Sequence, residues 1–148
     1  MSEIFGGAEF APAINIAHNY ASRERHFGKD VWVHWKGATF AGADTTGIIP
    51  GSQGTKSYIV RGRGSPDSFM SCSHGAGRVM GRKEAERRLD LSREREKIER
   101  QGIIHSLRSK RDLDEASGAY KEIGAVMRAQ DDLVKIFVEL SPVAVIKG

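Results

Sequence analysis

The sequence predicts a mixed α+β domain, in which strands carry glycine-rich loops and helices follow in the C-terminal half. Short stretches of β-branched and aromatic residues in the first half predict the strands, and a highly charged segment of helical periodicity over residues 79–101 predicts the first helix. The chain of 148 residues is long enough for one domain, and its 39% hydrophobic and 28% charged residues are typical of a globular fold.

The first third of the chain predicts an irregular start followed by a β-hairpin. Residues 1–16 are rich in Gly and Ala and keep no sustained period, so they are expected to form an irregular lead-in. Residues 15–20 and 31–35 contain aromatic and β-branched residues, and both are predicted strands. The segment 27–30 between them has the length and the glycine that a hairpin connection needs.

The next segments alternate between loops and short strands. Residues 36–55 contain several glycines and one proline, which predicts a long loop lying over something it binds. Residues 57–61 then predict a strand, 62–67 a turn, and 69–73 an extended segment.

The C-terminal half predicts two helices and two strands. Residues 79–101 alternate in charge at helical spacing, and Gly102 supplies a stop. The arginines of this helix are interpreted as a solvated face in preference to an RNA-contacting one. A second helix is predicted over 120–130, and the apolar runs 133–140 and 143–146 are predicted to be buried strands.

Charge and cysteine content narrow the class of protein. The net charge of +4 and the sequence pI near 9.4 are compatible with an anionic partner such as a nucleotide or RNA. The single cysteine, Cys72, excludes an intramolecular disulfide and fits a reducing compartment. The chain has no apolar run of the roughly 18 residues that a membrane span needs and no signal-peptide pattern. We therefore expect a cytoplasmic protein without a membrane partner.

The most informative local segment is 71–78, which places His74 among small residues with Arg78 four positions later. Glycine amides can approach phosphate oxygens, and a guanidinium can bind them through two donors. The segment is therefore a candidate seat for a nucleophilic imidazole beside a phosphate. The alternatives are a hydrogen-bonded turn histidine and an arginine held in a structural ion pair.

Five separated motifs occur in one order: residues 18–19, the loop 50–58, the segment 71–78, residues 119–121 and the terminal 145–148. Together they resemble the C-terminal part of the RtcB family of RNA-splicing ligases. The resemblance runs from about Ala17 to the last residue, so residues 17–148 are expected to form the C-terminal part of an RtcB-like catalytic domain. Family members are several hundred residues long, and the chain resembles only their final part.

The resemblance implies roles for several residues. His74 matches the family histidine that attacks GTP to form a guanylyl-histidine intermediate, and a neutral imidazole is a competent nucleophile toward a neutralised phosphate. His18 matches a manganese ligand and Asn19 a nucleotide-contacting position. Without the resemblance, His18 would more often be a packed or surface histidine.

Further residues match the family positions that surround the nucleotide: Pro50, Gly51, Ser52, Gln53, Ser57, Gly75, Ala76, Gly77, Tyr120 and Lys147. Gln53 departs from the methionine expected there, which weakens any side-chain role. Lys147 matches the penultimate lysine that contacts guanine. The alternatives are a plain glycine-rich turn for the loop, a core tyrosine for Tyr120 and a frayed terminus for Lys147.

The resemblance implies a ligase that uses GTP and Mn²⁺ to join RNA ends bearing a 2′,3′-cyclic phosphate or 3′-phosphate to 5′-hydroxyl ends, as in RNA splicing and repair. The family's other metal ligands, an Asp, a Cys and further histidines, have no match in this chain, and Cys72 does not replace them. The alternatives are therefore a catalytically silent nucleotide- or RNA-binding remnant, or one half of a split ligase completed by a separate N-terminal chain. A truncated chain is also expected to expose apolar surface.

Overall fold

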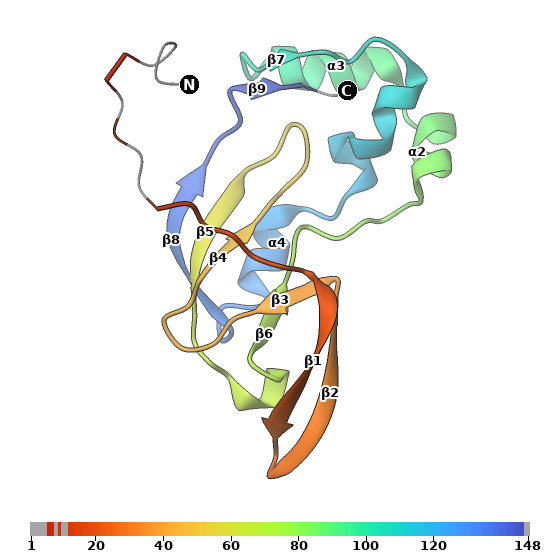
Figure 1. Cartoon of the computed structure of the whole chain (residues 1–148). Helices are drawn as coiled ribbons and strands as arrows, with labels where there is room; N and C mark the ends of the chain where they lie inside the picture. Colours follow the sequence, from red (N-terminus) through yellow and green to blue (C-terminus); the bar gives the residue numbers. More distant parts are fainter. Residues whose placement is uncertain (1–5, 8, 10–11, 147–148) are drawn as a thin grey trace.

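The computed structural model describes residues 6–7, 9 and 12–146. Its first regular element is a hairpin of β1 (Asn19–His26) and β2 (Lys29–Lys36), which projects from the rest of the domain (Figure 1). The predicted hairpin connection is confirmed, because Phe27 and Gly28 have positive φ values of 49° and 75°, as a tight two-residue turn requires. β1 lies later in the chain than the predicted strand, since its run of charged residues conceals the strand pattern.

The α+β class is confirmed, but the described strands form four small sheets instead of one mixed sheet. Apart from the hairpin, β3 (Ala38–Phe40) pairs antiparallel with β6 (Ser71–Ser73); β4 (Thr46–Ile49), β5 (Ser57–Gly62) and β8 (Val134–Leu140) form an antiparallel sheet; and β7 (Ile104–His105) pairs in parallel with β9 (Ala144–Val145). Most of these strands are short, and no single sheet runs through the whole described domain.

The prediction of an irregular loop over residues 36–55 is wrong in part, because β3 and β4 lie inside it. Gly47 belongs to β4 and lies opposite Val60. A Cβ at Gly47 would come within 3.2 Å of Val60 Cγ2, so this glycine marks close packing within a sheet.

The strand predictions at 57–61 and 133–140 are confirmed, but β8 is not buried. The extended segment predicted over 69–73 is confirmed only for the three residues of β6, because Phe69 and Met70 have positive φ values of 57° and 53° in a turn before the strand. It is the edge strand of the order β4–β5–β8, and Ile136 and Phe137 are 47% and 62% exposed. The predicted strand 143–146 contains only the two residues of β9, and Val143 and Ile146 are 79% and 92% exposed. The sequence analysis expected exposed apolar surface in a truncated chain, and these side chains are exposed. That truncation is the reason for their exposure remains a prediction.

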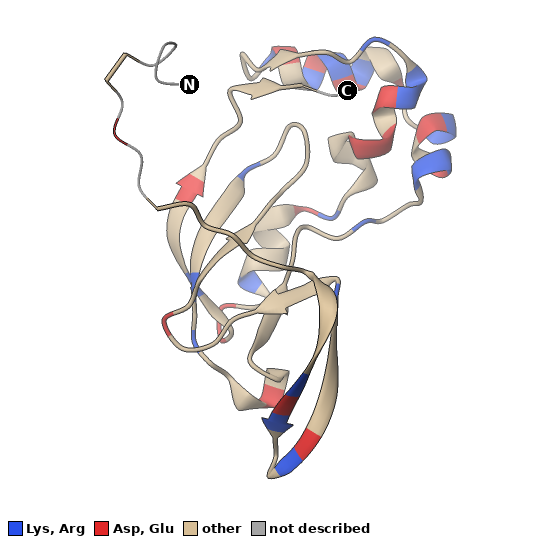
Figure 2. Ribbon diagram, viewed as in Figure 1, with Lys and Arg blue, Asp and Glu red and all other residues tan. Residues whose placement is uncertain are grey.

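The predicted helix over 79–101 divides into α2 (Arg82–Arg88) and α3 (Leu91–Glu99). Leu89 leaves the helical conformation with ψ of 145°, and the Asp90 side chain accepts a hydrogen bond from the Arg93 N–H at 2.8 Å, which starts a new helix. Basic and acidic residues alternate along both helices (Figure 2). Pairs such as Arg88–Glu84 at 2.7 Å and Arg100–Glu96 at 2.5 Å agree with a solvated face.

The second predicted helix is shorter than expected and consists of α4 (Ile123–Arg128). It is preceded by two 3₁₀ segments, η2 (Lys110–Glu115) and η3 (Ser117–Ala119). Tyr120 forms an antiparallel bridge with Arg78, so the chain is extended where a helix was predicted. The Glu122 carboxylate then accepts hydrogen bonds from the N–H groups of Gly124 and Ala125, and these bonds cap α4 and lower the pKa of Glu122.

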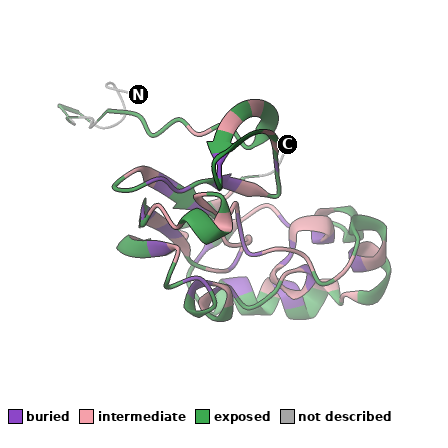
Figure 3. Ribbon diagram, turned by 90° about the horizontal axis from the view of Figure 1, so that it is seen from below, coloured by how far each residue is buried: buried purple, intermediate pink, exposed green. Residues whose placement is uncertain are grey.

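The main core lies between the β4–β5–β8 sheet, β6 and α4, and the burial of each residue can be followed in Figure 3. Ile49, Val60 and Val134 of the sheet pack with Cys72 of β6 and Met127 of α4. A smaller cluster, Ile98, Ile103 and Leu107, anchors α3. The strand β6 is therefore held on one side by the core, and the segment that follows it starts from a fixed position.

The inner face of the hairpin carries a buried polar cluster. Trp35, which is 2% exposed, donates its Nε1–H to Glu24 Oε1 at 2.7 Å, and His26 Nε2 lies 2.8 Å from Glu24 Oε2. Burial raises the pKa of Glu24, but the hydrogen bonds from Ser22, His26 and Trp35 outweigh this effect and hold the pKa below its ordinary value.

A lowered carboxyl pKa makes stability depend on pH in one direction. Because Glu24 binds a proton less readily in the folded chain than in the unfolded chain, its contribution is present above the ordinary pKa of about 4.3 and is lost as pH falls through the lower folded value. We expect Glu24→Gln to reduce the loss of urea stability between pH 5 and pH 3, whereas Glu84→Gln on the exposed face of α2 leaves most of that loss in place. Parallel curves for native chain and Glu24→Gln would contradict this assignment.

Candidate functional site

Two histidines from separate segments come together at the base of the hairpin. His18 precedes β1 and His74 follows β6, and their ring centroids are 5.6 Å apart with planes tilted by 58°. Neither ring has a hydrogen-bond partner among the described residues, so their nitrogens are available to a ligand. The structure therefore places the predicted nucleophile beside the predicted metal ligand.

The small residues after His74 bring the backbone close to the loop that begins at Pro50. The Ala76 N–H donates to the Pro50 carbonyl at 3.1 Å, and a Cβ at Gly75 would lie only 3.2 Å from the same oxygen. Gly77 has φ of 72°, a left-handed value that favours glycine. The two predicted nucleotide-binding segments are thus in contact with each other.

These segments line a cavity of about 730 Å³. The predicted site residues along it are His18, Pro50, Gly51, His74, Gly75, Ala76, Gly77 and Tyr120. Arg82 and Glu115 also line it, and sequence reasoning did not assign them to the site. In the sequence, only the positive charge of Arg82 could have suggested a place at a phosphate site, and a charged residue on a solvated helix face is explained equally well without one.

Arg78 is held by the protein and is not aimed freely at a phosphate. Its Nε donates to the Met80 carbonyl at 3.0 Å, Nη1 to the Tyr120 hydroxyl at 2.9 Å, and Nη2 to the Asp114 carbonyl at 2.5 Å. Its guanidinium also lies 4.8 Å from the centre of the Tyr120 ring. The structure therefore favours the structural interpretation of Arg78, in which the arginine joins the His74 segment to residues 114–120.

Tyr120 completes this network at the wall of the cavity. Its hydroxyl donates to Glu115 Oε2, and Glu115 Oε1 accepts from Arg78 and from Arg82 at 3.4 Å each. Burial and the hydrogen bond to Glu115 raise the pKa of Tyr120 above its ordinary value. Arg82 differs from Arg78 because its side chain is 72% exposed, although it also lies 3.4 Å from Glu115 Oε1 and lines the cavity.

The rest of the 50–57 loop faces a second cavity of about 370 Å³, which Ser52, Gln53 and Ser57 share with the C-terminal residues 144–146. Ser57 Oγ accepts from the Gly51 N–H at 3.2 Å, and Ser52 Oγ lies 2.9 Å from Thr55 Oγ1. These hydroxyls therefore stabilise the loop itself. Gln53 Oε1 is the one buried side-chain nitrogen or oxygen without a hydrogen-bond partner in the described part of the chain.

Two predicted site residues are not placed at either cavity by the described structure. Asn19 is exposed in β1, pairs with Lys36 across the hairpin and lines neither cavity. Lys147 lies outside the described residues. Their assigned roles remain predictions.

A buried glutamine positions the residue before His74. Gln130 of the segment after α4 is 5% exposed; its Oε1 accepts from the Ser73 N–H at 3.0 Å, and its Nε2 donates to Ser73 Oγ at 2.9 Å. This pair joins positions 57 residues apart in the chain. No local pattern in the sequence indicates this contact, because it exists only when α4 packs against β6.

The two glutamines predict opposite effects of one substitution. Gln53→Met is expected to raise the free energy of unfolding by about 1 kcal/mol, because it removes a buried acceptor that has no donor. Gln130→Met is expected to lower it by about 1–3 kcal/mol, because it leaves the Ser73 N–H unpaired. Urea unfolding followed by circular dichroism measures both, and a destabilised Gln53→Met chain would show that Oε1 is satisfied in solution.

The described residues do not form a complete metal centre. No three His, Cys, Asp or Glu side chains gather closely enough among them to hold an ion. Cys72 is buried, with its Sγ 3.4 Å from Thr39 Oγ1, and burial raises the pKa of its thiol. Within the part of the chain that is described, no helix has the length and apolar character to cross a bilayer.

Two imidazoles with unpaired ring nitrogens beside close-packed glycine backbone define a candidate phosphate- and nucleotide-handling site on an α+β domain. The chain belongs to the RtcB family, since the family model described as tRNA-splicing ligase RtcB matches residues 1–148. The resemblance inferred from the five motifs is thereby confirmed.

Individual relatives agree with this assignment. The chain is 46% identical over 135 residues to the RNA-splicing ligase RtcB of Escherichia coli strain K12, an alignment that covers 91% of this chain and 32% of the relative. It is 35% identical to the tRNA-splicing ligase RtcB of Pyrococcus horikoshii, covering 90% of this chain and 18% of the relative. The chain thus spans about a third or less of the length of these relatives.

Proposed function

We propose that this chain supplies the nucleophile and the nucleotide-binding loops of an RtcB-type RNA ligase. The complete enzyme would join RNA ends that bear a 2′,3′-cyclic phosphate or 3′-phosphate to 5′-hydroxyl ends, using GTP and Mn²⁺. The observation that carries the proposal is the placement of His74, with unpaired ring nitrogens, beside His18 in the glycine-lined cavity. Family membership supports the choice of RNA as the substrate.

In the proposed reaction, His74 acts first as a nucleophile and then as a leaving group. One ring nitrogen attacks the α-phosphorus of GTP, forming a phosphorus–nitrogen bond while the bond to pyrophosphate breaks. A 2′,3′-cyclic phosphate would first be opened by water, which breaks the bond from phosphorus to the 2′-oxygen and leaves a 3′-phosphate and a 2′-hydroxyl. The RNA 3′-phosphate takes the GMP group from His74, and the RNA 5′-hydroxyl then attacks the activated 3′-phosphate and releases GMP. The backbone amides of Gly75 and Gly77 and the exposed guanidinium of Arg82 are suited to the anionic oxygens, whereas the Ala76 N–H is already donated to the Pro50 carbonyl.

The loop 50–57 supports a nucleotide as the ligand because its residues are divided between the two cavities. A nucleotide lying across the loop could place its phosphates beside His74 and its base beside Gln53. The Gln53 side chain lines the second cavity, but its Oε1 is buried, so we assign it no hydrogen bond to the base. The approach of residues 144–146 to this loop is compatible with the predicted contact of Lys147 with the base.

Manganese does not fit the described residues alone. His18 is proposed as one ligand, and the other ligands must come from outside this set of residues. We therefore assign no step to the metal. The same observation favours a second candidate function, in which the chain is half of a split ligase completed by an N-terminal chain, or a silent nucleotide- or RNA-binding remnant.

A chimera tests the proposal in a complete protein. The 135 matched residues of the Escherichia coli relative would be replaced by the corresponding part of this chain. We expect the chimera to join an RNA with a 3′-phosphate to an RNA with a 5′-hydroxyl when GTP and Mn²⁺ are added. A folded chimera that binds GTP but forms neither a covalent nucleotide adduct nor a joined product would support the silent remnant.

A further inference from the structure

The β1–β2 hairpin has two faces of different character. Because paired residues of an antiparallel ladder point to the same side, Trp35 and Glu24 share the inner face with their partners, whereas Arg23 and Trp32 are paired on the outer face. The inner face contains the buried polar cluster described above. In the described part of the chain, the side chains of the outer face form no comparable buried cluster.

Trp32 is the most unusual residue of this outer face. Its indole is 68% exposed and has no aromatic or hydrogen-bonding partner among the described residues. Trp35, three residues later, is 2% exposed. An exposed indole is costly in water, and one beside an arginine offers a flat surface on which a base can stack.

Cations surround this indole. Arg23 and Arg25 of β1 lie on the same face, with side chains 67% and 73% exposed, and Lys36 lies at the base of the hairpin. Asp30 is the one carboxylate of this face, and it is shared by both arginines at 3.0 Å and 3.7 Å. Exposed ion pairs of this kind are weak, so phosphate oxygens can compete for the arginines.

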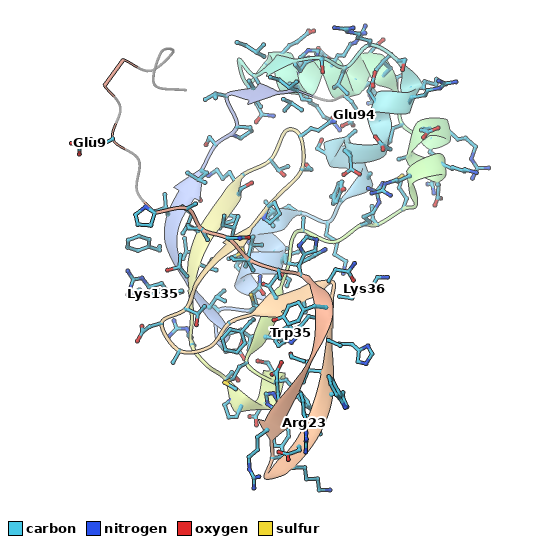
Figure 4. The ribbon with its side chains drawn as sticks, viewed as in Figure 1. Glu9, Arg23, Trp35, Lys36, Glu94 and Lys135 are labelled. Atoms are coloured by element: carbon cyan, nitrogen blue, oxygen red, sulfur yellow. The ribbon has the colours of Figure 1, made fainter. Side chains whose placement is uncertain are left out.

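The face runs directly from the candidate site. β1 begins at Asn19, next to His18, and β2 ends at Lys36, next to Gly37, whose carbonyl lies 3.4 Å from the His74 N atom. Figure 4 shows Lys36 at the base of the hairpin and Arg23 farther out. At about 3.3 Å per residue, Trp32 lies roughly 13 Å along the strand from Lys36.

We propose that the outer face of the hairpin, formed by Arg23, Arg25, Trp32, His34 and Lys36, binds the single-stranded RNA that leads into the His18–His74 cavity. Trp32 stacks on a base, and the arginines and Lys36 contact phosphates. The choice of RNA rests on the proposed RNA-joining function, but the binding itself needs neither GTP nor His74. An acidic peptide would satisfy the cations and would leave the indole without a stacking partner.

Binding of a fluorescein-labelled oligouridylate to the 148-residue chain, without GTP or Mn²⁺, tests this surface. Fluorescence anisotropy across a series of salt concentrations is expected to give a lower affinity by about tenfold for Trp32→Ala and to retain most of the affinity for Trp32→Phe. The double variant Arg23→Gln, Arg25→Gln is expected to reduce the salt slope by about two.

Phe137→Ala provides a matched control, because Phe137 is 62% exposed and lies under Arg61 on a different sheet. This variant is expected to bind the oligouridylate like the native chain. Equal losses in Trp32→Ala and Phe137→Ala would overturn the assignment, as would displacement of the RNA by polyglutamate as effectively as by unlabelled RNA. Binding that depends on Trp32 would stand even if His74 proved unreactive, so the two proposals can fail separately.

Tryptophan fluorescence gives a second readout. The chain has two tryptophans, and the emission of exposed Trp32 is expected to be quenched by RNA while buried Trp35 is unaffected. Trp32→Ala therefore removes the quenching and keeps the Trp35 signal as a check on folding. In the chimera, shielding of Trp32 from acrylamide before RNA is added would show that the rest of the protein covers this face, and would overturn the proposal.

Discussion

Replacing His74 by asparagine is expected to abolish covalent labelling of the Escherichia coli chimera by α-labelled GTP. Asparagine keeps a polar side chain of similar reach but offers no imidazole nitrogen to attack phosphorus. Denaturing electrophoresis measures the label, which is expected to fall by at least about a thousandfold, to background, because the covalent bond cannot form. The bound label should also be labile to acid, as a phosphorus–nitrogen bond is.

Two further histidine variants serve as controls for the loss of labelling. His34→Asn changes an exposed histidine of the hairpin and is expected to leave the labelling intact, because labelling requires no RNA. His18→Asn is expected to weaken labelling through the metal while leaving the nucleophile in place. If the His74→Asn chimera is labelled as strongly as the native chimera, another residue is the nucleophile and the proposed reaction is wrong.

Replacing Trp35 by alanine is expected to lower the free energy of unfolding by about 3–5 kcal/mol. The side chain is 2% exposed, stacks 6.0 Å from Tyr20 and meets Phe40 edge-on at 5.9 Å, so its removal leaves a large gap between the hairpin and β3. It also removes the N–H donor from Glu24. Urea unfolding followed by far-ultraviolet circular dichroism measures the loss.

Two variants separate the contributions of volume and hydrogen bonding. Trp35→Phe keeps most of the packing and loses the bond to Glu24, so it is expected to cost less than Trp35→Ala. Trp32→Ala removes an indole that is 68% exposed and is expected to change stability by less than about 0.5 kcal/mol. Similar losses for Trp32→Ala and Trp35→Ala would contradict the orientation of the hairpin.

Local signals were sufficient for several features. Residue type restricts the backbone conformation of each residue and its neighbours. This is enough to predict the Phe27–Gly28 turn, the strand at 57–61 and the close-packed loop around His74. The α+β class follows from the same local periodicities. Asp90 is also a local signal, since an aspartate favours the start of a helix, and it separates the two helices that were predicted as one.

Other features needed the folded chain because their partners are distant in sequence. The sequence could not show that β8 is an exposed edge strand, since its apolar run is equally compatible with a buried strand. Nor could it choose between phosphate and protein as the partner of Arg78, because Asp114 and Tyr120 come within hydrogen-bonding distance only through tertiary packing.

The candidate site shows the same division. By itself, the sequence determined that His74 lies in a glycine-rich segment with the order of motifs found in RtcB ligases. The tertiary structure alone brought His18 to 5.6 Å from His74 and fixed Ser73 to Gln130. The physical reason is that residue type restricts each local backbone conformation, whereas the distance between remote side chains is set by how the sheets, the hairpin and α4 pack together.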